Sequence, residues 1–417
     1  MANGQSSIQF PSNFFEEFPI LNETVNGKRL IYLDNAATTQ TPSCVVERIL
    51  QHYQHDNANV HRATHTLSNR STIAYENARE GVARYLNAPS ADCIVFTRGT
   101  TDSINVVAQA WAYAHPENYC VAASALEHHS NFVPWQQHAK RLDGNFYVIP
   151  LDDNGDIELD SLEALLSSYP INLIAVAHVS NVLGTVSPIK SIVACAHRHG
   201  AKVLVDAAQS IRHERIDVQN LDCDFLAFSG HKTLGPTGIG VLYGKKELLD
   251  ELPPTAFGGE MVDTVRAAAT SFERAPIKFE AGTPNYVGAI GLNTALEFIE
   301  RIGRDDICQY EHALIDYAQK ALSSVPLVQI LGSPRQRAGC ISFSVEGVHS
   351  FDLSTLMDAM GVAVRSGTQC AQPLLSEAYD IERVTRISPA FYNSFEEIDL
   401  CIDALEKAIV LCRRNAV

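Results

Sequence analysis

The chain has 417 residues, of which 46% are hydrophobic and 19% charged, and this length allows two domains with a large core. Its formal net charge of -16 disfavours nucleic-acid binding, which needs clustered lysine and arginine. No apolar run approaches the roughly 20 residues of a membrane span, and the polar N-terminus lacks the pattern of a signal peptide. We therefore expect a cytoplasmic protein that binds neither nucleic acid nor membrane.

The ten cysteines are scattered along the chain and include no C-x-x-C pair. The sequence therefore predicts neither a disulfide framework nor a metal site. Most of these cysteines lie in apolar runs, which is typical of reduced core residues.

The elements predicted before residue 90 are few. Residues 1–25 are expected to form an N-terminal arm or short helix that packs on a C-terminal domain. A short strand is predicted over residues 30–34, and helices over residues 42–55 and 67–87, where apolar residues recur at helical spacing.

From about residue 90 the pattern alternates between strand and helix. The predicted strands cover residues 93–96, 118–124, 172–178, 203–206 and 225–228, and helices are predicted over residues 103–113 and 189–199. Such alternation predicts an α/β fold in which helices cover both faces of a mostly parallel sheet.

Near residue 290 the pattern changes to a smaller α+β unit. Helices are predicted over residues 292–302, 310–322, 351–360 and 395–413, and strands over residues 339–345 and 362–365. We therefore expect a large domain over residues 26–290 and a small C-terminal domain over residues 291–417.

Polar residues follow several of the predicted strands, where ligands bind in parallel sheets. Thr100 and Thr101 follow Gly99 at the start of a helix, and such a turn can hold a phosphate, although helix capping explains it equally well. Asp206 and His128 also follow strands. In isolation, each is more often a structural hydrogen-bonding residue than a cofactor ligand.

Lys232 lies in a glycine-rich loop after the strand that ends in Ser229, Gly230 and His231. A lysine shielded from water there would have a lowered pKa and a nucleophilic amine, able to form a Schiff base with a carbonyl cofactor. The alternative is a lysine that points into solvent, which is the commoner case for a single lysine.

Together these residues resemble the cysteine desulfurases, which are pyridoxal-phosphate (PLP) enzymes of the aminotransferase class V with the type I fold. The resemblance covers nearly the whole chain and is carried by several short motifs. These are Asp206-x-x-Gln209, Ser229-Gly-His231-Lys232, Glu127-His128-His129, His178-Val-Ser-Asn181, Asn59-Val-His-Arg62, Thr97-Arg-Gly-Thr-Thr and Phe279-Glu-Ala-Gly-Thr-Pro-Asn285. Arg365-Ser-Gly-Thr-Gln-Cys370 is similar to the catalytic-cysteine loop of the second subgroup, the SufS and CsdA type.

The resemblance implies a role for each matched residue. Lys232 would hold PLP and act as the base, Asp206 would keep the pyridine nitrogen protonated, and His128 would stack on the ring. The full implied cofactor set is Lys232, Asp206, Gln209, Asn181, His128, Thr100, Thr101, Ser229, His231 and Thr283, the last contributed by the partner subunit of a homodimer. The implied substrate-binding residues are Arg386, Asn35, Ala36, His61 and Arg365.

Cys370 would be the catalytic nucleophile, since its polar, glycine-containing loop and the nearby Arg365 favour a reactive thiol. The implied reaction converts L-cysteine to L-alanine and a persulfide on Cys370, which then passes to a SufE-like or CsdE-like acceptor for iron–sulfur cluster or other sulfur-compound synthesis. This chain has Thr368-Gln369 where the family often carries histidine before the cysteine.

Other functions stay open from the sequence. Selenocysteine lyase activity would use the same site. Another class V enzyme, such as a kynureninase-like hydrolase or an aminotransferase, is disfavoured by Cys370. A non-catalytic sulfur-binding protein is disfavoured because Lys232 and Cys370 are both present, and a nicotinamide dehydrogenase because no GxGxxG follows a strand.

Overall fold

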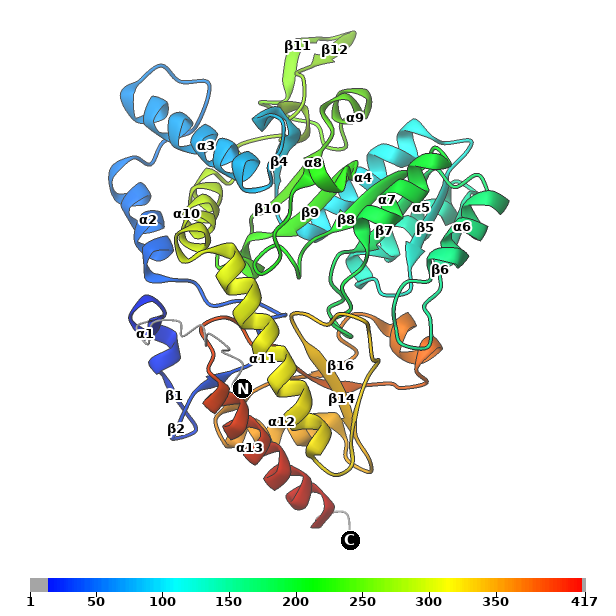
Figure 1. The fold of residues 1–417 in the computed structure, drawn as a ribbon. Helices are drawn as coiled ribbons and strands as arrows, with labels where there is room; N and C mark the ends of the chain where they lie inside the picture. The colour runs from blue at the N-terminus through cyan, green and yellow to red at the C-terminus, as the bar shows by residue number, and fades with distance from the viewer. Residues whose placement is uncertain (1–13, 415–417) are drawn as a thin grey trace, which may run out of the picture.

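A seven-stranded sheet forms the centre of the protein (Figure 1) in a computed structural model that describes residues 14–414. Its strand order is β4-β10-β9-β8-β7-β5-β6, and all strands run parallel except β10, which is antiparallel to both of its neighbours. The strands are β4 (Ile94–Thr97), β5 (Cys120–Ser124), β6 (Asn145–Ile149), β7 (Leu173–Ala177), β8 (Lys202–Asp206), β9 (Phe225–Ser229) and β10 (Gly240–Gly244).

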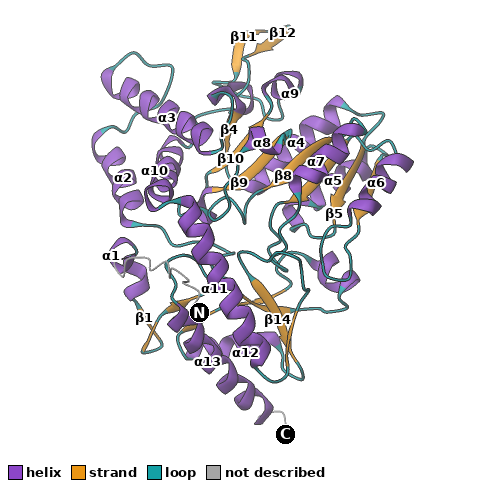
Figure 2. Ribbon diagram, viewed as in Figure 1, coloured by secondary structure: helices purple, strands orange, loops and turns teal. Residues whose placement is uncertain are grey.

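Helices lie on both faces of this sheet (Figure 2), because its strands are apolar on both sides. In β8, Val203 and Val205 face one hydrophobic cluster, whereas Leu204 faces the other. The helices of this part of the chain are α4 (Thr100–Ala114), α5 (Val133–Arg141), α6 (Leu159–Ser168), α7 (Ile189–Arg198), α8 (Val218–Leu221) and α9 (Lys246–Glu251). The predicted α/β architecture is confirmed.

Three further helices pack together beside the sheet. These are α2 (Ser43–His55), α3 (Thr66–Tyr85) and α10 (Tyr286–Ile302), and α10 contacts both of the others. The helix predicted from residue 292 thus begins six residues earlier, at Tyr286, where the side chain of Asn285 caps it by accepting from the Gly288 amide.

The C-terminal part is the predicted α+β unit. Its four-stranded sheet has the order β13-β14-β17-β16 and packs against long helices. Its elements are α11 (Arg304–Ser324), β13 (Val328–Ile330), β14 (Ile341–Val345), α12 (Ser350–Ala359), β15 (Val362–Ala363), β16 (Arg365–Gly367), β17 (Val384–Ile387) and α13 (Phe395–Arg414).

An early segment of the chain joins this C-terminal unit. Strand β3 (Ile31–Tyr32) pairs in parallel with β15, and Ile31 and Leu33 belong to the C-terminal core cluster. The expected limit at residue 290 lies inside α10. The expected limit at residue 290 therefore does not coincide with an element boundary, and the domain division stays a prediction.

Part of the predicted N-terminal arm, residues 1–13, lies outside the described residues. The rest forms α1 (Phe14–Glu17), the 3-10 turn η1 (Pro19–Asn22) and a small hairpin of β1 (Thr24–Val25) and β2 (Lys28–Arg29). Phe18 is fully buried and its ring contacts Phe298 of α10 and Tyr392 near the C-terminal unit. Within residues 14–414, no helix is long and apolar enough to cross a membrane.

Candidate active site

A cavity of about 510 Å³ opens at the carboxyl ends of the parallel strands, where the sheet meets the C-terminal unit. Most of the predicted site residues line it. They are Ala36, Thr100, Thr101, His128, Asn181, Asp206, Gln209, Ser229, His231, Lys232, Arg365, Cys370 and Arg386.

Lys232 reaches this cavity from a short 3-10 turn, η4 (Gly230–Lys232), directly after β9. Its side chain opens onto the cavity rather than onto bulk solvent. Burial lowers the pKa of its amine, and the nearby Asp206 only partly opposes this. A larger share of the amine is therefore neutral and nucleophilic than in an exposed lysine.

Asp206 ends β8 and is almost fully buried, and its Oδ1 accepts from the Ala208 amide at 2.9 Å. Burial raises the pKa of this carboxyl, whereas the amide and Lys232 counteract the rise. His128, which follows β5, is half-buried, and burial together with Lys232 lowers its pKa to about 3. Its imidazole is thus neutral at physiological pH, and its Nδ1 accepts from the Ser130 amide at 3.1 Å.

One end of the cavity is rich in hydroxyl and amide donors. Gly99 has a φ of 153°, which only glycine adopts readily, and this turn places the start of α4 against β9. The Thr100 amide donates to Ser229 Oγ at 2.7 Å, while the Thr101 and Ser130 hydroxyls lie 2.7 Å apart. Hydroxyls beside a helix N-terminus suit a phosphate, which supports the predicted anion cradle.

Two amide side chains hold the cavity walls together. Gln209 donates from Nε2 to the Ala36 carbonyl at 2.8 Å, which ties the β8 loop to the segment after β3. Asn181 donates from Nδ2 to the Gln369 carbonyl at 2.8 Å, which ties the β7 loop to the Cys370 loop. Both residues therefore position loops as well as lining the cavity.

Two arginines face the cavity from adjacent strands of the C-terminal sheet. Arg386 on β17 is buried, and its Nη1 donates to the Asn181 carbonyl at 2.8 Å. Arg365 on β16 donates from Nε to both Asp34 oxygens at 3.1 Å, and Arg386 reaches Asp34 at 3.3 Å. A guanidinium held in this way presents a fixed fork to a substrate carboxylate.

Cys370 lies on a loop after β16 and is the exposed one among the ten free cysteines. Its carbonyl accepts from the His129 amide at 2.7 Å, and the Gln372 amide donates to His129 Nε2 at 3.1 Å. Gln369 and Cys370 both have positive φ, 52° and 55°, so two successive residues hold a conformation that non-glycine residues rarely adopt. The loop thus presents the thiol at the cavity mouth.

Three predicted site residues do not line the cavity. Asn35 is buried in a polar network with Ser388, Asn393 and Tyr392, although its neighbour Ala36 does line it. His61 bonds Glu76 at 2.9 Å. Thr283 lines a separate cavity of about 920 Å³ that shares Thr100, Thr101, Ser229 and His231 with the first one.

Sequence reasoning missed Asp34 and Ser130. Asp34 ends the predicted strand 30–34, so the strand-end position that pointed to Asp206 also applied to it. Ser130 lines the cavity next to His128 and carried no signal beyond its position after β5. Gln369 was noted only as a departure from the family pattern, yet it also lines the cavity.

A half-buried lysine and a helix N-terminus with hydroxyl donors lie at the strand ends of a mostly parallel α/β sheet, and an arginine pair faces them from the C-terminal sheet. This arrangement is typical of an enzyme site for a small anionic ligand. The model of the aminotransferase class-V family matches residues 31–401. The chain therefore belongs to the class-V aminotransferase family.

Curated relatives and a solved structure show which members of this family the chain resembles. The chain is 47% identical over 391 residues to a probable cysteine desulfurase of Halalkalibacterium halodurans, covering 94% of this chain and 96% of that one. It is 46% identical over 392 residues to a cysteine desulfurase of Synechococcus elongatus, covering 94% of this chain but only 62% of that longer protein. A crystal structure of the Escherichia coli cysteine desulfurase CsdA, in an S-sulfonic acid form, superposes with a TM-score of 0.88 at 39% identity over 97% of this chain and 100% of that one.

Proposed function

We propose that this protein is a PLP-dependent cysteine desulfurase that converts L-cysteine to L-alanine and carries the sulfur as a persulfide on Cys370. The observation that carries the proposal is that one cavity holds both a half-buried lysine with a lowered pKa and an exposed cysteine. The lysine amine suits reaction with a carbonyl group, and the exposed cysteine thiol suits transfer of sulfur to a partner. The resemblance to desulfurases of known structure agrees with this reaction.

The residues present fit PLP. No described hydrogen bond occupies the Lys232 amine, so the amine is free to bind the aldehyde carbon. Thr100, Thr101 and Ser229 line the cavity and would donate to the phosphate, and Asp206, which also lines it, would pair with the pyridine nitrogen. When bound, PLP withdraws electrons from the substrate carbon, so that its proton and its neighbouring bonds break more easily.

Different residues of the chain carry out the separate steps of the reaction. Arg386 binds the substrate carboxylate, and neutral Lys232 accepts the Cα proton because its pKa is lowered. The Cys370 sulfur attacks the substrate sulfur, so that an S–S bond forms and the Cβ–S bond breaks. The electron pair of that bond stays on Cβ, which takes up a proton equivalent to the one that the Cys370 thiol gives up and becomes the methyl group of alanine. Lys232 returns its proton to Cα.

The exposed position of Cys370 suits delivery to a second protein. We propose a SufE-like or CsdE-like acceptor, with iron–sulfur clusters or other sulfur compounds as the destination. Ten free cysteines suit the reducing cytoplasm, where we place the protein. Selenocysteine is not favoured as the substrate, since the relatives described above are named as desulfurases.

The decisive experiment measures alanine and sulfide formed from L-cysteine in the presence of a thiol reductant. Cys370→Ser should abolish both products while the PLP absorption stays, and Cys412→Ser, at a half-buried thiol outside the cavity, should behave as wild type. Lys232→Ala should lower the rate by roughly 10²–10⁴ and lose covalently bound PLP. Lys245→Ala, which affects a lysine paired with Asp222, is its control. Full alanine production by Cys370→Ser would refute the proposal.

A further inference from the structure

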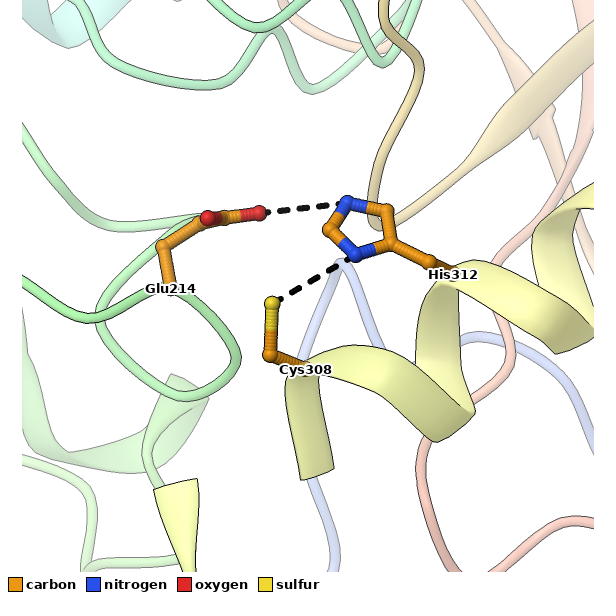
Figure 3. Close-up of side chains that lie close together, drawn as sticks. All are labelled: Glu214, Cys308 and His312. Atoms are coloured by element: carbon orange, nitrogen blue, oxygen red, sulfur yellow. Dashed lines mark hydrogen bonds and ion pairs between the residues drawn. The ribbon is translucent and has the colours of Figure 1, made fainter. Parts of the chain in front are cut away.

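A second cluster of reactive side chains lies outside the cavity, between α11 and the loop after β8. Cys308 and His312 stand one turn apart on α11, and Glu214 faces them from the loop (Figure 3). Cys308 Sγ lies 3.4 Å from His312 Nδ1, and His312 Nε2 lies 3.4 Å from Glu214 Oε1. Among residues 14–414, this is the group of three metal-type ligands whose atoms lie within 4.8 Å of one another.

The polar atoms of this cluster are incompletely satisfied. Glu214 Oε1 and His312 Nε2 are both buried, and neither has a hydrogen-bond partner among the described residues, since their mutual contact lacks hydrogen-bond geometry. Buried polar atoms without hydrogen bonds carry a free-energy cost. A ligand that accepts electron pairs from a carboxylate and an imidazole would remove this cost.

The distances between the ligand atoms of these three side chains fit a small, borderline-soft cation. Zinc bonds of about 2.0–2.3 Å in tetrahedral geometry place neighbouring ligand atoms about 3.3–3.8 Å apart. The 3.4 Å between Cys308 Sγ and His312 Nδ1 meets this value. Glu214 faces the other ring nitrogen, so its carboxylate has to move by roughly 1 Å to complete the set. Thiolate, imidazole and carboxylate together favour zinc over magnesium or calcium.

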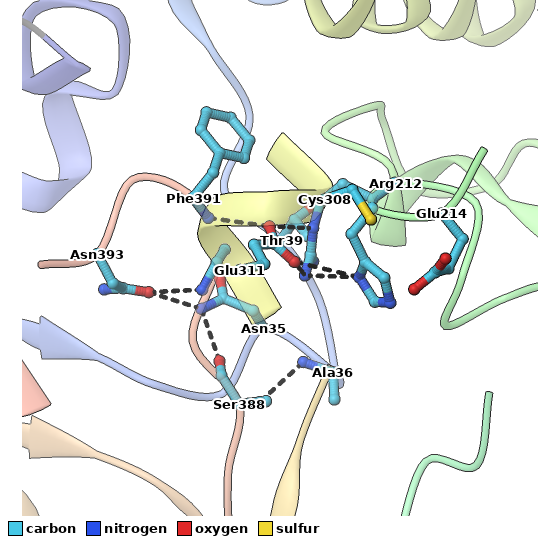
Figure 4. A network of polar contacts seen from close by, with 12 residues as sticks. Asn35, Ala36, Thr39, Arg212, Glu214, Cys308, Glu311, Ser388, Phe391 and Asn393 are labelled. Atoms are coloured by element: carbon cyan, nitrogen blue, oxygen red, sulfur yellow. Dashed lines mark hydrogen bonds and ion pairs between the residues drawn. The ribbon is translucent and has the colours of Figure 1, made fainter. Parts of the chain in front are cut away.

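A rigid polar network supports the two sides of the cluster. Glu311 lies on α11 between the two ligands of that helix and accepts from Arg212 Nη2 at 2.8 Å and from the Phe391 amide at 2.9 Å (Figure 4). His213 lies 3.1 Å from the same carboxylate. Arg212 and His213 directly precede Glu214, so these buried contacts fix the backbone of the loop against the helix, while the Glu214 side chain can still turn toward the other two ligands.

We propose that Cys308, His312 and Glu214 form a zinc site that fastens the loop after β8 to α11, with a fourth position open to water. Without metal, burial and the charge of Glu214 raise the pKa of the Cys308 thiol to about 12, so the thiol is protonated. On binding, the S–H bond breaks, a zinc–sulfur bond forms, and the proton leaves to solvent without any change of oxidation state. The site is independent of the reaction proposed for the cavity.

The test uses full-length PLP-bound protein, stripped of metal by a chelator, in a Cys370→Ser background that removes the exposed thiol. Cobalt(II) is the probe, because tetrahedral cobalt absorbs at longer wavelengths than PLP. We expect one equivalent of cobalt to bind with tetrahedral absorption and one equivalent of zinc to displace it. Zinc should also raise the unfolding temperature.

Cys308→Ser and His312→Gln should each weaken this binding roughly 100-fold or more. Cys412→Ser, at the half-buried thiol of α13, should leave binding unchanged. Unchanged PLP absorption in each variant establishes that it is folded. The proposal is overturned if the background protein binds no stoichiometric cobalt, or if Cys308→Ser binds it as tightly as the background protein does.

Discussion

Gln369, the residue before Cys370, carries a side-chain amide with no hydrogen-bond partner within residues 14–414. Only 7% of the residue is exposed, and neither Nε2 nor Oε1 has a hydrogen bond among the described residues. Its backbone is also held at a positive φ of 52°. Unpaired buried polar groups and strained backbone gather at functional sites, where they lower stability.

Replacing Gln369 by methionine should therefore stabilise the protein. Methionine has nearly the same shape but no amide to desolvate, so we expect the free energy of unfolding to rise by about 1 kcal/mol. Denaturant unfolding measures this change. Gln209→Met is the matched control, since Gln209 donates to the Ala36 carbonyl and should lose about 1 kcal/mol. A loss of stability in Gln369→Met would show that its amide is paired in solution.

At the scale of elements, the hairpin of β11 (Val262–Arg266) and β12 (Ala269–Phe272) stands out from the body of the protein (Figure 1). Nearly all of its side chains are exposed, including Val265 at 64%, and Phe257 beside it is 68% exposed. An isolated two-stranded hairpin is only marginally stable in water. We therefore infer that a second copy of the chain covers it, in line with the predicted homodimer.

Negative charges placed on this hairpin and on Phe257 beside it should break the dimer. In the double variant Phe257→Asp/Val265→Asp, two carboxylates would be buried without partners, so we expect the dimer dissociation constant to rise roughly 100-fold. Sedimentation velocity over a range of concentrations measures it. Val410→Asp, at an exposed apolar position on α13, should have no effect. A monomeric parent, or an unchanged double variant, would contradict the inference.

The sequence could predict the helices and strands, which follow from local periodicity, and the site residues that follow parallel strands. A parallel sheet aligns its strand ends, so Asp206, Asn181 and Lys232 could be placed at one cavity before the fold was known. Asp34 carried the same strand-end signal, but its pairing with Arg365 and Arg386 depends on β3 lying beside β15, far along the chain, which no local pattern indicates. The cluster of Glu214 and Cys308 was equally hidden, since no spacing pattern joins residues that meet only through tertiary packing.

At the scale of the whole molecule, Glu311 joins three distant segments. Its carboxylate is buried and contacts Arg212 from the loop after β8, as well as the Phe391 amide (Figure 4). It also lies 3.1 Å from His213 of the same loop. Burial alone would raise the pKa of this carboxyl, but Arg212 and His213 outweigh it and lower the pKa to about 2. The charged network therefore contributes to stability only while Glu311 is ionised.

This depressed pKa predicts a defined acid dependence. Glu311 in the unfolded chain titrates at the ordinary glutamate pKa of 4.5, so between about pH 4.5 and pH 2 the unfolded chain binds the proton that the folded protein does not. The contribution of Glu311 is thus complete above pH 4.5 and is lost as the pH falls toward 2. A difference of about 2.5 units corresponds to on the order of 3 kcal/mol.

Comparing wild type with Glu311→Gln isolates this contribution from that of other carboxyls. The variant should be less stable at neutral pH, because Arg212 loses its buried counter-charge, and the difference in unfolding free energy should shrink steadily from pH 4.5 to pH 2. Denaturant unfolding with a chelator present keeps metal at Cys308 from contributing. Glu406→Gln, at an exposed position on α13, should show no such pH-dependent difference. A difference between wild type and Glu311→Gln that stays constant across this range would mean that Arg212 and His213 do not hold Glu311 ionised.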